Sequence, residues 1–188
     1  STQSALLADW LRARGRRPVM TFEPGDTPVG KQLREILLGH DTGALHPRTE
    51  ALLYAADRAE HVGAVIRPAL ERGEVVITDR YLDSSLAYQG AGRSLAVADV
   101  ASLSAWATAG LLPDLTVVLD VDPAVGLGRF DTPADRLEAE PLAFHQRVRE
   151  EFLALAEREP QRYLVLDAAL GVESLHAAIC RAVEERLA

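Results

Sequence analysis

A charged pair, Asp79 and Arg80, stands directly after a short apolar run, where a parallel sheet would place it to bind an anion. Residues 75–78 are Val, Val, Ile and Thr, and a continuous run of this kind is typical of a strand buried on both faces of a parallel sheet. Ligands of open α/β sheets bind beyond the carboxyl ends of the strands. An arginine at such an end suits bidentate phosphate binding. The alternative is a local ion pair at the end of the strand.

The next residues carry hydroxyl and aromatic groups with helical spacing. Tyr81, Ser84, Ser85 and Tyr88 are at positions i, i+3, i+4 and i+7, which form one face of an α-helix. Such a face can contact a single ligand. An aromatic stripe at this spacing is also typical of a core, and for Tyr81 both interpretations stay open.

A second polar group lies nearer the N-terminus. Tyr54, Asp57 and Arg58 occupy one helical turn at i, i+3 and i+4. A surface ion pair beside a buried tyrosine is the alternative to a binding role. Before this turn, residues 23–26 (Glu-Pro-Gly-Asp) end an apolar run, and their Pro and Gly break regular structure.

Strands that alternate with helices must position these groups, which predicts an open α/β sheet with right-handed crossovers. Apolar runs predict strands at residues 18–22, 75–78, 115–119 and 163–166. Apolar residues that recur with a 3.6-residue period predict a helix at residues 4–14 and another from about residue 48 to 72. Between them, a further helix is predicted to follow residues 23–26 and to run through Leu38.

The composition predicts a single domain over residues 1–188, with 48% apolar residues. The formal charge of -8 argues against polymeric nucleic acid as a partner, because such binding needs a basic surface. No apolar run approaches the roughly 18 residues of a membrane span, and no secretion signal is visible, so we expect a cytoplasmic protein without membrane contact. Cys180 is expected to pack in a helix. The five histidines, His145 among them, lack metal-ligand spacing and are expected to be structural or solvent-facing.

Four phrases occur together in one order and spacing: residues 23–27 (EPGDT), 53–58 (LYAADR), 79–81 (DRY) and 84–90 (SSLAYQG). In this combination the chain resembles bacterial thymidylate kinases, which are P-loop nucleoside monophosphate kinases, over nearly its whole length. The resemblance implies a P-loop NTPase-type three-layer α/β sandwich with a parallel five-stranded sheet. It also implies that the first, central strand and the phosphate-binding (Walker A) loop G-x-x-x-x-G-K-[ST] are missing from the given chain and would precede Ser1.

The same resemblance implies transfer of the ATP γ-phosphate to dTMP, with Mg²⁺ as the metal ion. The partners would be the small molecules dTMP and ATP, and the assembly a homodimer. The expected catalytic residues are Arg80, Asp79 and, from a lid segment at residues 128–138, Arg136 and Arg129. The expected contacts of dTMP are Tyr54, Asp57, Arg58, Ser84, Ser85, Tyr88, Gln89, Glu23 and Pro24. The expected contacts of ATP are Ser1 and Thr2, and the expected ligands of Mg²⁺ are Ser1 and Asp79.

The chain departs from the family pattern in the loop after the first visible strand. Many relatives have arginine before the Glu and a second glycine after the first, whereas this chain has Phe22 and Asp26. One phosphate contact would then be absent or supplied elsewhere, and the role of Asp26 stays open. Two other functions also stay open: a P-loop kinase with another nucleoside or nucleotide acceptor, and a nucleotide-binding module without turnover. The second arises because Lys31 lies in the wrong element to replace the lysine of the loop.

Overall fold

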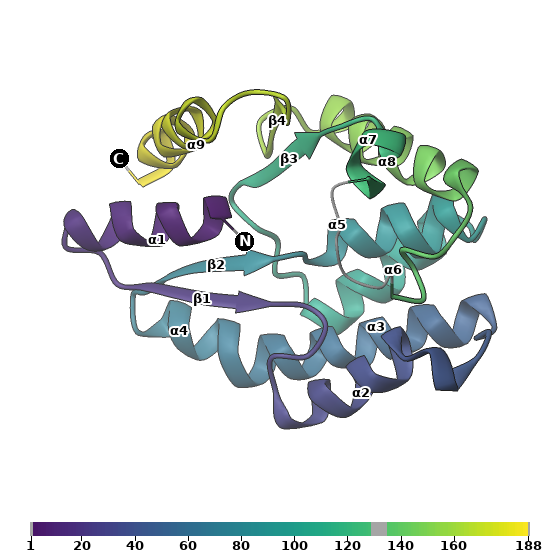
Figure 1. The fold of residues 1–188 in the computed structure, drawn as a ribbon. Helices are drawn as coiled ribbons and strands as arrows, with labels where there is room; N and C mark the ends of the chain where they lie inside the picture. The colour runs from purple at the N-terminus through teal and green to yellow at the C-terminus, as the bar shows by residue number, and fades with distance from the viewer. Residues whose placement is uncertain (1, 129–134, 188) are drawn as a thin grey trace.

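Helices and strands alternate along the chain, as the sequence predicts (Figure 1). The computed structural model describes residues 2–128 and 135–187. The strands are β1 (Pro18–Phe22), β2 (Val75–Asp79), β3 (Thr116–Asp120) and β4 (Tyr163–Asp167). The α-helices are α1 (Thr2–Ala13), α2 (Pro28–Leu38), α3 (Pro47–His61), α4 (Arg67–Glu71), α5 (Leu82–Ser85), α6 (Val97–Thr108), α7 (Pro123–Leu127), α8 (Leu142–Arg158) and α9 (Val172–Leu187). Other helical turns are the 3₁₀-helix η1 (His40–Thr42) and the π-helices η2 (Val62–Ile66) and η3 (Leu86–Gly92).

In the described part of the chain the strands form two parallel pairs. β1 pairs with β2 from Pro18 opposite Val75 to Phe22 opposite Asp79, and β3 pairs with β4 in the same way. Helices lie on both sides of the strands, which gives the layered α/β arrangement expected from the sequence (Figure 1). The four strands lie where the apolar runs predict them, and residues 2–128 and 135–187 contain no fifth strand.

The strands β2 and β3 are less buried than their apolar sequences predict. Residues 75–78 are only partly buried, and Leu119 in β3 keeps 40% of its surface exposed. The prediction that β2 is buried on both faces is therefore wrong for this structure. Within residues 2–128 and 135–187, β2 and β3 each pair along one edge only, so neither is enclosed as a central strand would be.

The helices that flank the first strand pair begin and end as the sequence indicates. Helix α2 starts after Thr27, whose hydroxyl accepts a hydrogen bond from the Gly30 N–H (2.8 Å), and Pro28 occupies the first turn. The long helix predicted for residues 48–72 is one continuous helical segment made of α3, η2 and α4. Its π-helical turn at η2 is a local widening that periodicity alone does not reveal.

Buried apolar side chains form two clusters, of which the first joins helices to the strands and the second is made of residues outside the strands. The first includes Val62, Leu86 and Leu155, and the second includes Tyr54 and Phe144. Cys180 is buried on α9, as predicted. Among the described residues, no helix combines the length and the apolar character that crossing a membrane requires.

Candidate functional site

A pocket lies where the chain leaves the carboxyl ends of β1 and β2. Its walls come from the loop after β1, from α2, α3, α5 and η3, and from residues 135–145. All residues predicted to contact dTMP except Asp57 line it, together with Arg80 from the predicted catalytic set. The complete lining is Glu23, Pro24, Arg34, Leu38, Tyr54, Arg58, Arg80, Ser84, Ser85, Tyr88, Gln89, Asp135, Leu137, Glu138 and His145.

The loop after β1 is shaped by glycines and held by Asp57. Gly25 has φ +119°, a conformation that a residue with a side chain rarely adopts, and its N–H donates to Asp57 Oδ1 (3.0 Å). A Cβ atom at Gly30 would lie 2.5 Å from the same oxygen. Asp57 thus lies behind the loop and outside the pocket lining. Burial, and next the charge of Glu23, raise the pKa of Asp57 to about 6.

A buried ion pair fixes one wall of the pocket. Arg58 is 1% exposed, and its Nε donates to Glu23 Oε2 (2.9 Å). The other Glu23 oxygen lies 2.9 Å from Nδ1 of His61, and Nε2 of that ring lies 2.5 Å from the Thr21 hydroxyl. His61 is 1% exposed, so the expectation that it is structural fits its position. These contacts hold the Arg58 guanidinium at the pocket in one orientation.

Arg58 also links the pocket to the serines of α5. Its Nη1 donates to the Ser85 hydroxyl (3.0 Å), and its Nη2 donates to the Tyr81 carbonyl (3.2 Å). Tyr54, on the same helix as Arg58, is 8% exposed, and burial raises the pKa of its hydroxyl far above the ordinary value. The pocket therefore places an aromatic ring, a guanidinium and a hydroxyl together.

Arg80 occupies the mouth of the pocket. It is exposed, has a left-handed backbone (φ +69°), and its guanidinium lies 5.0 Å from the centroid of the Tyr88 ring. A non-glycine residue in this conformation costs on the order of 1–3 kcal/mol, and such conformations cluster at functional sites. The Thr78 hydroxyl stabilises the turn by donating to the Arg80 carbonyl (2.8 Å).

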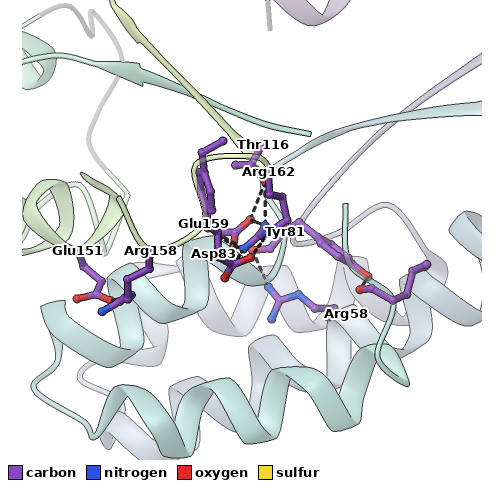
Figure 2. Close-up of polar contacts among 10 residues, drawn as sticks. Arg58, Tyr81, Asp83, Thr116, Glu151, Arg158, Glu159 and Arg162 are labelled. Carbon is purple, nitrogen blue, oxygen red and sulfur yellow. Dashed lines mark hydrogen bonds and ion pairs between the residues drawn. The ribbon is translucent and has the colours of Figure 1, made fainter. Parts of the chain in front are cut away.

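Helix α5 is anchored by Asp83, which is 3% exposed. Arg162 donates to both of its carboxylate oxygens (3.0 Å each), and the hydroxyls of Thr116 and Tyr163 donate to it as well (3.0 and 2.5 Å; Figure 2). These partners lie at the starts of β3 and β4. The network therefore ties the serines of α5 to the second strand pair.

The predicted helical face at residues 81–88 is only partly correct. Ser84, Ser85 and Tyr88 line the pocket, but Tyr81 precedes the helix with an extended backbone and belongs to the core. Its hydroxyl donates to the Leu111 carbonyl (3.2 Å). From residue 86 onward the helix has π-helical turns, which the i, i+3, i+4 pattern did not indicate.

Glu50, at 0% exposure, is a buried carboxylate beside the pocket that accepts several hydrogen bonds. Its carboxylate accepts hydrogen bonds from Gln89 Nε2 (3.0 Å), from Arg93 Nε and Nη2 (3.1 Å each) and from Arg136 Nη2 (2.6 Å). Burial opposes ionisation of Glu50, but the hydrogen bonds from Arg93, Gln89 and Arg136 outweigh it and lower the pKa of Glu50 below its ordinary value. The pattern of one glutamate with three donors was not visible in the sequence because its members are far apart.

Several predicted site residues lie outside the pocket lining. Arg136 turns its guanidinium towards Glu50 and the Leu37 carbonyl (2.8 Å), so its expected role over ATP stays a prediction. Thr2 is exposed at the start of α1, and Asp79 is exposed at the end of β2. Ser1 and Arg129 lie outside the described residues.

Sequence reasoning missed other residues of the pocket. Arg34 on α2 lines the pocket and donates to the Pro24 carbonyl (2.7 Å). Its position in the helix that directly follows the loop of residues 23–27 was the signal that could have identified it. Asp135 and Glu138 add negative charge to the lining. His145 also lines the pocket, and its buried Nε2 atom has no hydrogen-bond partner among residues 2–128 and 135–187, so the expectation that it is structural or solvent-facing stays a prediction. The sequence did not indicate this position, because the contacts of α8 with α5 and η3 join segments that are far apart in the chain.

A parallel α/β fold with arginines, an aromatic ring and a side-chain amide gathered at the carboxyl ends of its strands defines a nucleotide-binding protein of the α/β class. A crystal structure of thymidylate kinase from Ehrlichia chaffeensis is similar to the chain with a TM-score of 0.78 and 29% identity, and the match covers 97% of this chain and 90% of that one. That likeness gives the chain the P-loop NTPase type of α/β fold.

The family model described as "Thymidylate kinase" matches residues 1–179 of the chain. A protein of Leifsonia xyli subsp. xyli named thymidylate kinase is 60% identical over 185 residues, with 96% of this chain and 87% of that protein covered. A thymidylate kinase of Deinococcus radiodurans is 52% identical over 188 residues, covering 99% of this chain and 91% of that protein. The chain belongs to the thymidylate kinase family.

Proposed function

We propose that the chain transfers the γ-phosphate of ATP to dTMP, giving dTDP, and that the pocket described above holds dTMP. Family membership supports the reaction. The pocket supports the assignment of the acceptor, because a phosphate-binding arginine and a base-sized aromatic wall face the same space. Phosphoryl transfer depends chiefly on positioning and charge neutralisation, which these residues can supply.

Within this proposal Arg80 binds the phosphate of dTMP. The single observation that carries it is the placement of Arg80: exposed, in a strained backbone, beside Tyr88 and at the end of β2. Tyr54 and Arg58 line the same pocket, where the thymine would stack and meet hydrogen-bond donors. Ser84, Glu23 and Pro24 complete the wall around the sugar and base. Asp57 acts on the substrate through the loop that it holds.

We further propose that the phosphates of ATP lie at the start of α1, near Ser1 and Thr2. The first turn of α1 has no acidic residue among those described, and a helix N-terminus favours anions. α1 packs on β1 and β2, and its start lies towards the carboxyl end of β2 in Figure 1. Arg136 and Arg129, the latter outside the described residues, are proposed as the lid residues that neutralise charge on ATP.

Mg²⁺ is the metal ion that this reaction uses. No group of three or more acidic, histidine or cysteine side chains suited to a metal occurs among residues 2–128 and 135–187. Mg²⁺ bound with nucleotides needs only one or two protein ligands, and we assign this role to Asp79 and to Ser1, which lies outside the described residues. When bound, Mg²⁺ would neutralise phosphate charge.

We also propose that a further parallel strand lies between β2 and β3, followed by a G-x-x-x-x-G-K-[ST] loop that leads into α1. The half-exposed apolar faces of β2 and β3 support it, because such runs are ordinarily buried. A polypeptide extended at its N-terminus by such a strand should unfold at a higher denaturant concentration than residues 1–188. Equal midpoints would contradict the added strand.

The proposed assembly is a cytoplasmic homodimer formed by α3 and α6. These helices contact one another and expose Leu52 (56%) and Trp106 (81%). We assign the dimer contact to these helices because a subunit interface would bury such large exposed apolar side chains. Sedimentation of a Trp106→Glu variant should then show monomers, and an unchanged sedimentation coefficient would remove this surface from the proposal.

An acceptor panel tests the proposed reaction. ADP release should be measured with dTMP, dCMP and dGMP as acceptors, using a polypeptide that carries the proposed phosphate-binding loop. We expect dTMP to give the highest kcat/KM. Equal rates with dCMP or dGMP would refute the acceptor, and a lack of ADP release with any acceptor would refute the kinase activity.

A further inference from the structure

The side-chain amide of Gln89 has its orientation decided by Glu50. A carboxylate can only accept hydrogen bonds, and Glu50 Oε1 receives one from Gln89 Nε2 at 3.0 Å. If the amide were reversed, two oxygen atoms would face each other at that distance. Glu50 also accepts from Arg93 and Arg136, which keep it ionised in the interior.

This orientation turns the oxygen of Gln89 towards the pocket. Gln89 is 1% exposed and lines the pocket, and the hydrogen bonds of its side chain within residues 2–128 and 135–187 end at Glu50. Oε1 is therefore the group left for a ligand. Nearby, Arg58 donates to the Ser85 oxygen, which leaves the Ser85 hydroxyl hydrogen free to donate.

The pocket thus offers an acceptor beside a donor. The edge of thymine carries an N3–H donor flanked by two carbonyl acceptors, and this pattern is complementary to Gln89 Oε1 and Ser85 O–H. Cytosine carries an acceptor at N3, which would face the Gln89 oxygen without a hydrogen between them. A buried polar group left without a partner in this way is the strongest basis for rejecting a substrate analogue.

We propose that Glu50 is a positioning residue for base selectivity, which fixes Gln89 so that the pocket selects a pyrimidine nucleotide with an N3–H donor over one with an N3 acceptor. The inference rests on the proposed function, since it concerns the same acceptor pocket. Glu50 itself does not line the pocket and acts through Gln89.

The informative substitution is Glu50→Gln. An amide at this position can donate to Gln89 Oε1, so the Gln89 amide is free to reverse and to present its NH₂ group to the base. The ratio of dTMP to dCMP affinity, measured by calorimetry, should then fall by roughly tenfold to hundredfold. N3-methyl-dTMP, which lacks the N3 hydrogen, should bind wild type more weakly than dTMP does. The ratio of dTMP affinity to N3-methyl-dTMP affinity should be smaller in E50Q than in wild type.

Two further variants separate selectivity from general disturbance. Arg93→Gln removes another hydrogen-bond donor to Glu50, and Arg93 has no hydrogen bond to the Gln89 side chain among the described residues. The R93Q variant should therefore keep the wild-type ratio of dTMP to dCMP affinity. Because E50Q leaves the partly buried Arg136 guanidinium without its carboxylate, the double variant E50Q with Arg136→Met is the form to measure if E50Q does not fold. Circular dichroism should verify the fold in each case.

The outcomes are distinct. Loss of selectivity in E50Q, or in the double variant, with a wild-type ratio in R93Q supports the proposal. A wild-type ratio in folded E50Q, or an equal loss in R93Q, overturns it. If the wild-type protein binds none of the three nucleotides, the proposed dTMP pocket itself is wrong.

Discussion

The pH dependence of stability gives a sharp test of the pocket loop, through Asp57. This residue is 1% exposed, its Oδ2 atom has no hydrogen-bond partner within residues 2–128 and 135–187, and its pKa is raised from 3.8 to about 6. In the folded state Asp57 therefore holds its proton to a higher pH than in the unfolded state. Below about pH 4 Asp57 is protonated in both states and its titration does not change the free energy of unfolding. This free energy then falls as the pH rises from about 4 through about 6.

The size of this effect follows from the two pKa values. A difference between 3.8 and about 6 corresponds to at most about 3 kcal/mol above pH 6, at roughly 1.4 kcal/mol for each unit of pKa. Asp57→Asn removes the charge and keeps an oxygen that can accept from the Gly25 N–H. We expect the variant to be more stable than wild type by about 1–3 kcal/mol near pH 8, and nearly equal to it near pH 4.

Urea unfolding of both proteins across this pH range measures the difference. Asp114→Asn, at an exposed position, is the matched control and should show little change with pH. If the stability difference between D57N and wild type is the same at both ends of the range, Asp57 does not titrate as its burial indicates.

Three further substitutions test the site and its support. Arg80→Ala should reduce kcat/KM for dTMP by about two orders of magnitude or more while circular dichroism stays unchanged, and wild-type turnover would mean that the phosphate binds elsewhere. Glu23→Gln breaks the buried pair with Arg58 and should lower the free energy of unfolding by about 3–5 kcal/mol, measured in urea; a change below about 1 kcal/mol would contradict the pairing. Tyr163→Phe removes a hydrogen bond to the Asp83 carboxylate and should cost about 1.5–3 kcal/mol in thermal unfolding, whereas an unchanged Tm would show that Arg162 and Thr116 hold Asp83 without it.

Local sequence determined the elements and most members of the pocket. Apolar runs placed all four described strands, and Thr27 with Pro28 marks the start of α2 through chemistry that acts within one turn. The position of Arg80 after a strand was enough to predict that it lies at a ligand-binding edge, because parallel strands share that edge.

Tertiary structure decided which side chains face the ligand and which support them. Asp57 and Arg58 are neighbours on α3, yet one lies behind the loop and the other at the pocket, because their partners Gly25 and Glu23 come from a different element. Tyr81 left the predicted face because it precedes α5 with an extended backbone and packs in the core. Glu50 and His145 acquired their places only through contacts between distant segments, which periodicity and spacing do not encode.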